Sequence, residues 1–136
     1  MTARARSWLL TCVAMLAGAG TLAGCGDKKA AGSSGVREAW QAAGLEVTAF
    51  ATVDGANYAG GKCRAGKVAG LDAVLCDYAD DAALSRGVEA GYASLGDETA
   101  AVVQHGRSIL IIADRARVDP DGQRLNRASN LFRGTE

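Results

Sequence analysis

The hydrophobic positions divide the chain into three stretches. A nearly unbroken apolar run covers residues 8–19 and follows two basic residues, Arg4 and Arg6. Residues 26–35 read GDKKAAGSSG and show no apolar periodicity, which is typical of a flexible linker. From Val36 to the C-terminus, apolar residues recur with the spacings of helices and strands. We therefore predict a single folded domain over residues 36–136.

The domain opens with a short predicted helix. It begins near a candidate N-cap, Ser34, ends at Gly44 and has three apolar residues on one face: Val36, Trp40 and Ala43. We expect Trp40 to anchor the core. Residues 45–53 alternate in polarity and contain valine, threonine and phenylalanine, so they predict a strand. Residues 54–61 predict an irregular loop.

Two hairpin–helix units follow. Residues 62–68 and 71–78 predict a hairpin around Ala69-Gly70, and residues 99–104 and 107–113 predict another around His105-Gly106. The helix after the first hairpin starts at Asp80 or Asp81, ends at Gly96 and has four predicted core residues: Leu84, Val88, Tyr92 and Leu95.

The last predicted helix lies at the C-terminus. Asp119 is its candidate N-cap, Pro120 its first residue and Gly134 its stop. Its predicted core residues are Leu125, Ala128, Leu131 and Phe132.

These elements together predict an α+β fold. We expect an antiparallel sheet of four to five strands with three helices, in the order α-β-(ββα)-(ββα). Residues 109–112 read ILII and are apolar at every position, which indicates a central strand covered on both faces. Helices on one face cannot provide that cover, so we expect the first helix or a partner to lie on the other.

The N-terminal pattern ends in the residues Leu22-Ala23-Gly24-Cys25. In this order, a basic start, an apolar run and this box resemble the signal peptide of bacterial lipoproteins. The resemblance implies a diacylglycerol thioether on Cys25, cleavage before it, and acylation of the new amino group with a fatty acid such as palmitate. Residues 1–24 would then be a signal peptide, residues 25–35 the acylated cysteine and linker. The alternative is an ordinary secretory signal that ends near a cysteine.

The same resemblance gives an expected location. It implies a domain held to a membrane of the cell envelope by lipid and facing the periplasm. Gly26, rather than an aspartate, follows the cysteine and favours the outer membrane over the inner. Two or three acyl chains make a durable anchor, whereas one chain holds a protein only marginally.

The net charge becomes slightly negative once the signal peptide is excluded from the count. The full chain has 15 basic and 15 acidic residues, but Arg4 and Arg6 lie in the signal peptide, so 13 basic residues remain against all 15 acidic ones. A slightly acidic domain argues against nucleic acid as a partner. The length of 136 residues excludes a multidomain enzyme, and the 49% of hydrophobic residues excludes a wholly disordered chain.

Cysteine usage predicts one disulfide bond in the domain. Cys12 lies in the signal peptide and Cys25 is the lipidation site, which leaves Cys63 and Cys76. If a two-residue turn pairs Val68 with Leu71, counting back places Cys63 opposite Cys76 at a non-hydrogen-bonded site, where Cα atoms lie about 4.5 Å apart. The same register sets Lys67 against Asp72. Alanine is a poor residue for this turn, and a four-residue loop would give the same pairing.

Two motifs match known binding motifs only in part. Residues 61–67 fit the start of a phosphate-binding P-loop, but Val68 stands where the magnesium-binding hydroxyl is needed. Residues 119–122 resemble the middle of an EF-hand calcium loop, but Arg117 and Ala128 stand where acidic ligands are needed. We therefore expect neither a metal nor a cofactor.

The remaining candidates for chemistry are isolated. Asp77, Asp80 and Asp81 cluster before a helix, where carboxylates act as caps, and a weak cation site is the alternative. Asp114 follows a buried strand beside Arg115 and Arg117, which favours an ion pair. The only histidine, His105, lies in a predicted turn, where we expect it to be exposed.

These observations favour a non-enzymatic, lipid-anchored domain that binds a protein or another envelope component, or a second copy of itself. Such a domain should expose an apolar patch near Tyr58, Phe50 or the sheet edge. A small ligand-binding or sensory module is the alternative, and it should enclose a polar pocket. A hydrolase is a further alternative, and it should bring Asp77 and Asp114 together in a cleft.

Overall fold

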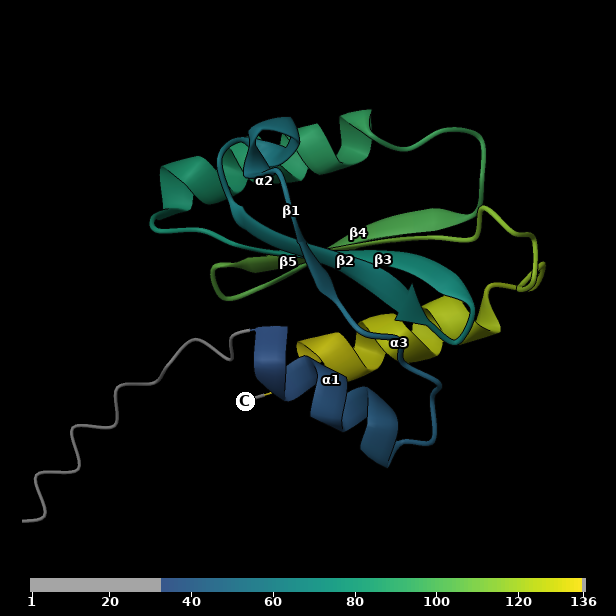
Figure 1. Cartoon of the computed structure of the whole chain (residues 1–136). Coiled ribbons are helices and arrows are strands. Elements are labelled where there is room, and N and C mark those ends of the chain that lie inside the picture. Colours follow the sequence, from purple (N-terminus) through teal and green to yellow (C-terminus); the bar gives the residue numbers. More distant parts are fainter. Residues whose placement is uncertain (1–32, 136) are drawn as a thin grey trace, which may run out of the picture.

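A computed structural model describes residues 33–135, which form three layers (Figure 1). The middle layer is a five-stranded antiparallel sheet with the strand order β1-β2-β3-β5-β4. Helix α2 covers one face of the sheet, and helices α1 and α3 cover the other. This arrangement confirms the predicted α+β class with three helices. None of these helices has the length and hydrophobicity needed to cross a lipid bilayer.

The strands and helices have the following bounds. The strands are β1 (Ala51–Val53), β2 (Lys62–Val68), β3 (Leu71–Asp77), β4 (Ala100–His105) and β5 (Ser108–Ala113). The helices are α1 (Ser33–Ala42), α2 (Asp81–Ala93) and α3 (Gln123–Arg133), and a short 3-10 helix, η1 (Gly55–Tyr58), follows β1.

Helix α1 begins earlier and the first strand is shorter than the sequence indicates. The helix starts at Ser33, so Ser34 lies inside it rather than at its N-cap. Of the predicted strand over residues 45–53, only Ala51–Val53 is regular, with one isolated bridge between Val47 and Val68. The regular pairing is interrupted between them, where the Thr48 hydroxyl accepts a 2.8 Å bond from the Lys67 amide in place of a backbone carbonyl. The Phe50 ring turns toward α1 and lies 6.2 Å from the Trp40 ring.

Both hairpins have two-residue turns. In the first hairpin Val68 pairs with Leu71, and the turn residues Ala69 and Gly70 have φ angles of 51° and 84°. The register is therefore the predicted one, although alanine adopts a left-handed conformation that glycine takes more easily. The second turn lies one residue later than predicted, at Gly106 and Arg107, so His105 ends strand β4.

Strand β5 is the centre of the core. All six of its residues are buried, which confirms that residues 109–112 form a strand covered on both faces. Ile109 and Ile111 pack on the α2 side, whereas Leu110 and Ile112 pack on the α1 and α3 side. Alternation along one strand thus supplies both hydrophobic clusters.

Helix α2 contacts the sheet through glycines. Its buried residues are Leu84, Gly87 and Gly91, and a Cβ atom added at Gly87 would lie 2.2 Å from the ring of Tyr78. This close approach sets the rotation of the helix and leaves Tyr92 59% exposed. The prediction that Tyr92 lies in the core is wrong, whereas Asp80 is the N-cap and accepts a 2.7 Å bond from the Ala83 amide.

Helix α3 starts later than predicted. Asp119 and Pro120 lie in the loop before it, and Gly122, with a φ angle of 68°, precedes its first residue. The predicted N-cap is therefore wrong. The Asp119 carboxylate still stabilises the start of the helix, because its Oδ2 atom accepts a 2.9 Å hydrogen bond from the Leu125 amide in the first turn. Leu125, Ala128 and Phe132 are buried as predicted, and Leu131 is half-buried.

Candidate functional site

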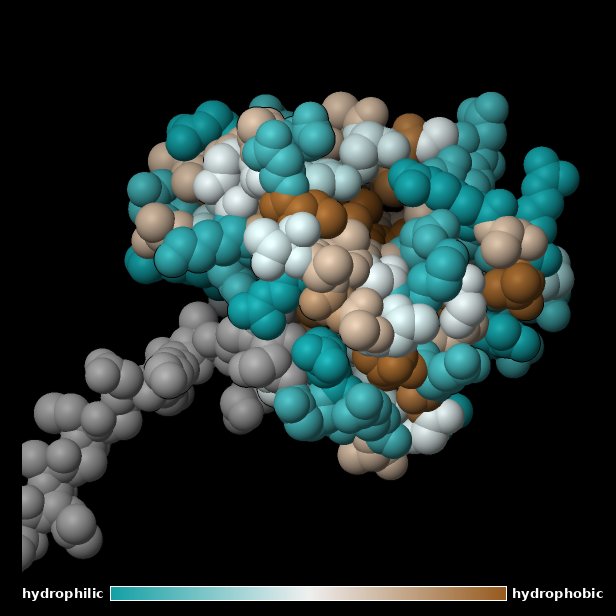
Figure 2. Space-filling view, in the orientation of Figure 1, coloured by the Kyte–Doolittle hydropathy of each residue, from teal (hydrophilic) through white to brown (hydrophobic). Residues whose placement is uncertain are grey.

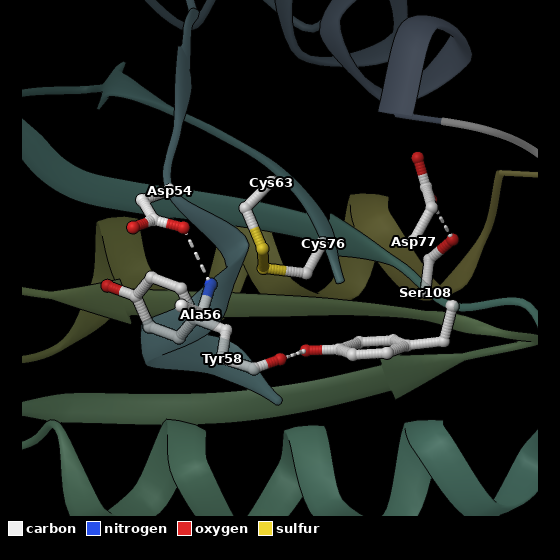
Figure 3. The surroundings of a disulfide bond; sticks show 8 residues. Asp54, Ala56, Tyr58, Cys63, Cys76, Asp77 and Ser108 are labelled. Carbon is white, nitrogen blue, oxygen red and sulfur yellow. Dashed lines mark hydrogen bonds between the residues drawn. A yellow bond between two sulfur atoms is a disulfide. The ribbon is translucent and has the colours of Figure 1, made fainter. Parts of the chain in front are cut away.

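The predicted disulfide joins β2 to β3 on the face that α2 covers (Figure 3). Cys63 and Cys76 are direct partners in the strand register, and their Cα atoms lie 4.1 Å apart. The residues are 2% and 0% exposed, so solvent thiols do not reach the sulfur atoms in the folded state. The bond is therefore a structural one.

The 3-10 helix η1 closes one side of the disulfide. Its N-cap, Asp54, accepts a 2.9 Å bond from the Ala56 amide, and the Tyr78 hydroxyl donates a 2.8 Å bond to the Tyr58 carbonyl (Figure 3). Burial, and to a lesser extent the nearby Tyr58, raises the pKa of Tyr78, so its phenol stays protonated and remains a donor. This contact could not be predicted from the sequence, because residues 54–61 carry no regular pattern.

The three aspartates near the start of α2 have separate roles. Asp77 accepts a short hydrogen bond from the Ser108 hydroxyl across β3 and β5, and Asp80 caps α2. Asp81 lies 3.3 Å from the Arg107 side chain in an exposed ion pair. Over residues 33–135 no three acidic, histidine or cysteine side chains converge on a point that could hold a metal ion. The capping interpretation is confirmed for Asp80.

The Asp114 carboxylate binds backbone amides of the loop that follows it and does not form an ion pair. It is 4% exposed, and its two carboxylate oxygens accept bonds of 2.9 and 2.8 Å from the Val118 and Asp119 amides. Within the described part of the chain, neither Arg115 nor Arg117 forms a salt bridge with it. The predicted ion pair is therefore wrong, because backbone amides satisfy the buried carboxylate instead.

Asp77 and Asp114 do not form a carboxylate pair. Asp77 lies opposite Ser108, the first residue of β5, and Asp114 follows Ala113, the last residue of the same strand. Six residues of a strand span about 20 Å, so these groups lie at opposite ends of the sheet. The cleft that a hydrolase at these residues requires is not formed.

A polar hollow of about 570 Å³ lies at the Asp114 end of the sheet. Its walls come from the loop before β4 and the loop after β5 and include Asp97, Glu98, Asp114, Arg115 and Arg117. Arg115 lies 3.4 Å from Glu98, and backbone amides of residues 98 and 96 together with Arg115 lower the pKa of Glu98. Arg117 adopts a left-handed backbone with a φ angle of 53°. The hollow thus presents both signs of charge.

A second groove of about 630 Å³ runs between α1 and α3. Its polar lining follows one stripe of α3, formed by Gln123, Asn126, Arg127 and Asn130. The Arg127 guanidinium donates a 2.6 Å bond to the carbonyl of Ala43, just after α1, and so ties the two helices together. This groove was not predicted, although the sequence places the four polar residues at helical spacing.

The predicted apolar patch near Tyr58 and Phe50 is not exposed. Both side chains are half-buried, and Phe50 packs between Trp40 and the Arg37 guanidinium, which lies 5.8 Å from its ring. In the view of Figure 2, brown and tan side chains form a narrow band across the middle of the surface, with polar side chains on both sides. His105 is also half-buried, with its ring edge against Phe132 at 6.0 Å, rather than exposed in a turn.

Comparison of the chain with protein-family models, with curated proteins and with solved structures gave no match. The predicted signal peptide, the lipidation site Cys25 and the linker up to residue 32 lie outside the described residues. The function is therefore inferred from the residues of this chain alone.

Proposed function

We propose that the chain is a lipid-anchored domain of the bacterial cell envelope that faces the periplasm and binds a protein or another envelope component. The box Leu22-Ala23-Gly24-Cys25, placed after the basic start and the apolar run, carries this proposal. The buried Cys63–Cys76 disulfide supports export, because such bonds persist in oxidising compartments.

The position of α1 supports a domain held close to the membrane. Helix α1 begins at Ser33, eight residues after Cys25, and a fully extended connection of that length spans at most about 30 Å. The domain can therefore reach partners in the same membrane or just above it, but not partners far across the periplasm.

The use of the carboxylates supports binding rather than catalysis. Asp80 caps α2, Asp114 holds the loop before α3 through backbone amides, and Asp119 binds the first turn of α3. A general acid or base needs a partner group placed across a substrate, and Asp77 and Asp114 lie at opposite ends of β5. These groups stabilise the fold in their observed positions.

Replacing Cys25 with serine tests the anchor. We expect C25S to move most of the protein from the membrane fraction to the soluble periplasmic fraction, and to abolish labelling by a radioactive or clickable palmitate, because no thioether can form. The matched control is Cys12→Ser, which removes a cysteine from the predicted signal peptide and should leave both fractionation and labelling unchanged. A C25S protein that remains in the membrane, or a parent chain that takes up no lipid label, would refute the anchor.

A small-ligand function is the second candidate, and the hollow at the Asp114 end favours it. A site with guanidinium groups and carboxylates suits zwitterionic compounds such as free amino acids and short peptides. Binding at 100 times the Kd should stabilise the domain by about 2.7 kcal/mol and raise its Tm by several degrees. We expect such a shift in a thermal unfolding screen of amino acids and dipeptides, and expect Arg117→Ala to remove it.

The control for this screen is Arg86→Ala, which changes an exposed arginine on α2, away from the hollow. A shift that persists in R117A, or a screen in which no compound raises the Tm, would exclude this candidate.

A further inference from the structure

Strand β4 leaves one long edge of the sheet open. The order β1-β2-β3-β5-β4 makes β1 and β4 the two edge strands (Figure 1). Strand β1 has only three residues and turns directly into η1, so it offers little edge. Strand β4 has six residues, and no strand among residues 33–135 pairs with its outer side.

The register shows which backbone groups point outward. His105 and Ser108 flank a two-residue turn and form a hydrogen-bonded pair, so every second residue of β4, His105, Val103 and Ala101, bonds to β5. The residues between them direct their N–H and C=O groups away from the sheet. They are Ala100, Val102 and Gln104.

The side chains of β4 do not protect this edge. Its sequence, AAVVQH, contains no lysine, no carboxylate, no proline and no glycine, and β4 pairs with β5 along its whole length without a bulge. Natural edge strands usually carry such features, because an open edge is a template for another strand. The absence of all of them points to an edge that is paired in the working protein.

We propose that β4 pairs with β4 of a second copy of the chain, in antiparallel orientation, to form one continuous ten-stranded sheet. In antiparallel pairing, opposite residues lie on the same face, and a twofold axis through Val102 satisfies this condition. Val102 then faces Val102 of the second copy, and Ala100 faces Gln104. All outward N–H and C=O groups are paired in this register, and no charged side chains oppose each other within the strands.

The charges at the two ends of β4 fit a second copy. In this register, the turn at Gly106-Arg107 of one copy lies beside the segment before β4 of the other, which contains Asp97. Asp97 is exposed and takes part in none of the ion pairs of the described residues. Arg107 is exposed as well, and its guanidinium has further N–H donors besides those that bond Asp81 and the Ala79 carbonyl. The twofold axis therefore brings opposite charges together at both ends. A strand from an unrelated protein would not supply this match.

Cysteine cross-linking in intact cells tests both the pairing and its register. Residues 100 and 104 of opposite copies would have Cα atoms about 5.5 Å apart, within disulfide range. The two single-cysteine variants are the controls. Residue 100 of one copy lies about 14 Å from residue 100 of the other, and the two copies of residue 104 are equally far apart. We therefore expect A100C alone and Q104C alone to give little dimer on a non-reducing gel. Two differently tagged copies, one A100C and one Q104C, should give at least about tenfold more of the mixed dimer.

Charged pairs supply a second measurement that does not depend on cysteine. In Cys25→Ser chains, A100K/Q104K places like charges opposite each other at both ends of the interface, whereas A100E/Q104K places opposite charges there. We expect analytical ultracentrifugation to give a dimer Kd at least about tenfold weaker for the first variant than for the second. Far-UV circular dichroism should be the same for both, which shows that each is folded.

Each outcome decides the proposal. Equal dimer Kd values for the two charge variants, or mixed cross-links no stronger than those of the single variants, would overturn it. Cross-links from Q104C to a different protein would also overturn it in favour of a foreign strand at this edge. The pairing does not depend on the lipid anchor, so a dimer in the C25S background stands even if C25S does not change membrane attachment.

Discussion

Replacing Trp40 with alanine should lower the free energy of unfolding by about 3–5 kcal/mol. The side chain is fully buried between α1 and α3, and its Nε1 atom donates a 2.9 Å hydrogen bond to the Ala128 carbonyl. The change leaves a cavity and removes the larger of the two buried apolar side chains of α1, the other being Val36. A domain of this size is usually stable by about 5–15 kcal/mol, so the urea midpoint should fall by roughly a fifth or more.

Two further variants separate the causes of this loss. Trp40→Phe keeps most of the ring but cannot donate the hydrogen bond, and we expect it to cost about 1–2 kcal/mol. Tyr92→Ala removes another aromatic ring from a helix, but Tyr92 is 59% exposed, so its cost should stay within about 0.5 kcal/mol. If W40A and Y92A unfold at the same urea concentration, α1 is not part of the core.

The register of the first hairpin could be predicted from the sequence because the information is local. A two-residue turn determines which residues of the two strands lie opposite each other. The pairs Cys63–Cys76 and Lys67–Asp72 therefore follow by counting back from the turn. The central position of β5 was equally accessible, since four successive apolar residues need cover on both faces. These predictions required no knowledge of how the helices pack.

Two of the errors concern features that depend on distant contacts. Residues 45–50 alternate like a strand, but Phe50 packs on Trp40, and Gly66 of β2 leaves the space that its ring occupies. Helix α2 packs Leu84, Val88 and Leu95 on the core as predicted, but it turns Tyr92 outward. It approaches the sheet through Gly87, which rests against the ring of Tyr78, just after β3. Periodicity alone does not reveal such a contact, since glycine carries no hydrophobic signal.

The sequence identified residues of the candidate site, but it did not reveal the contacts that they make. The sequence singled out Asp114, Arg115 and Arg117, and they do line one hollow. It did not show that backbone amides four and five residues later would bind the Asp114 carboxylate, because such bonds depend on the path of the loop. The groove between α1 and α3 was missed because it requires two helices that are 80 residues apart to lie side by side.

Removing the disulfide with Cys63→Ala and Cys76→Ala together should cost about 3 kcal/mol. The bond closes a loop with a sequence separation of 13, and its main effect is to restrict the unfolded chain. Both positions are buried among apolar side chains, so alanine leaves a small cavity, whereas serine would add an unpaired hydroxyl and cost more. Urea unfolding of the parent chain with and without reductant should show a loss of similar size.

The same hairpin provides the control for this loss. Lys67 and Asp72 face each other nearer the turn, with Nζ and Oδ1 2.6 Å apart, but their side chains are 50% and 33% exposed. Replacing both with alanine should cost less than about 1 kcal/mol, because water and salt screen an exposed ion pair. A hairpin whose stability depended on cross-strand pairing in general would lose similar amounts in both double variants. Mass spectrometry of the unreduced protein tests whether the disulfide bond is formed, since free thiols at both Cys63 and Cys76 would show that it is absent.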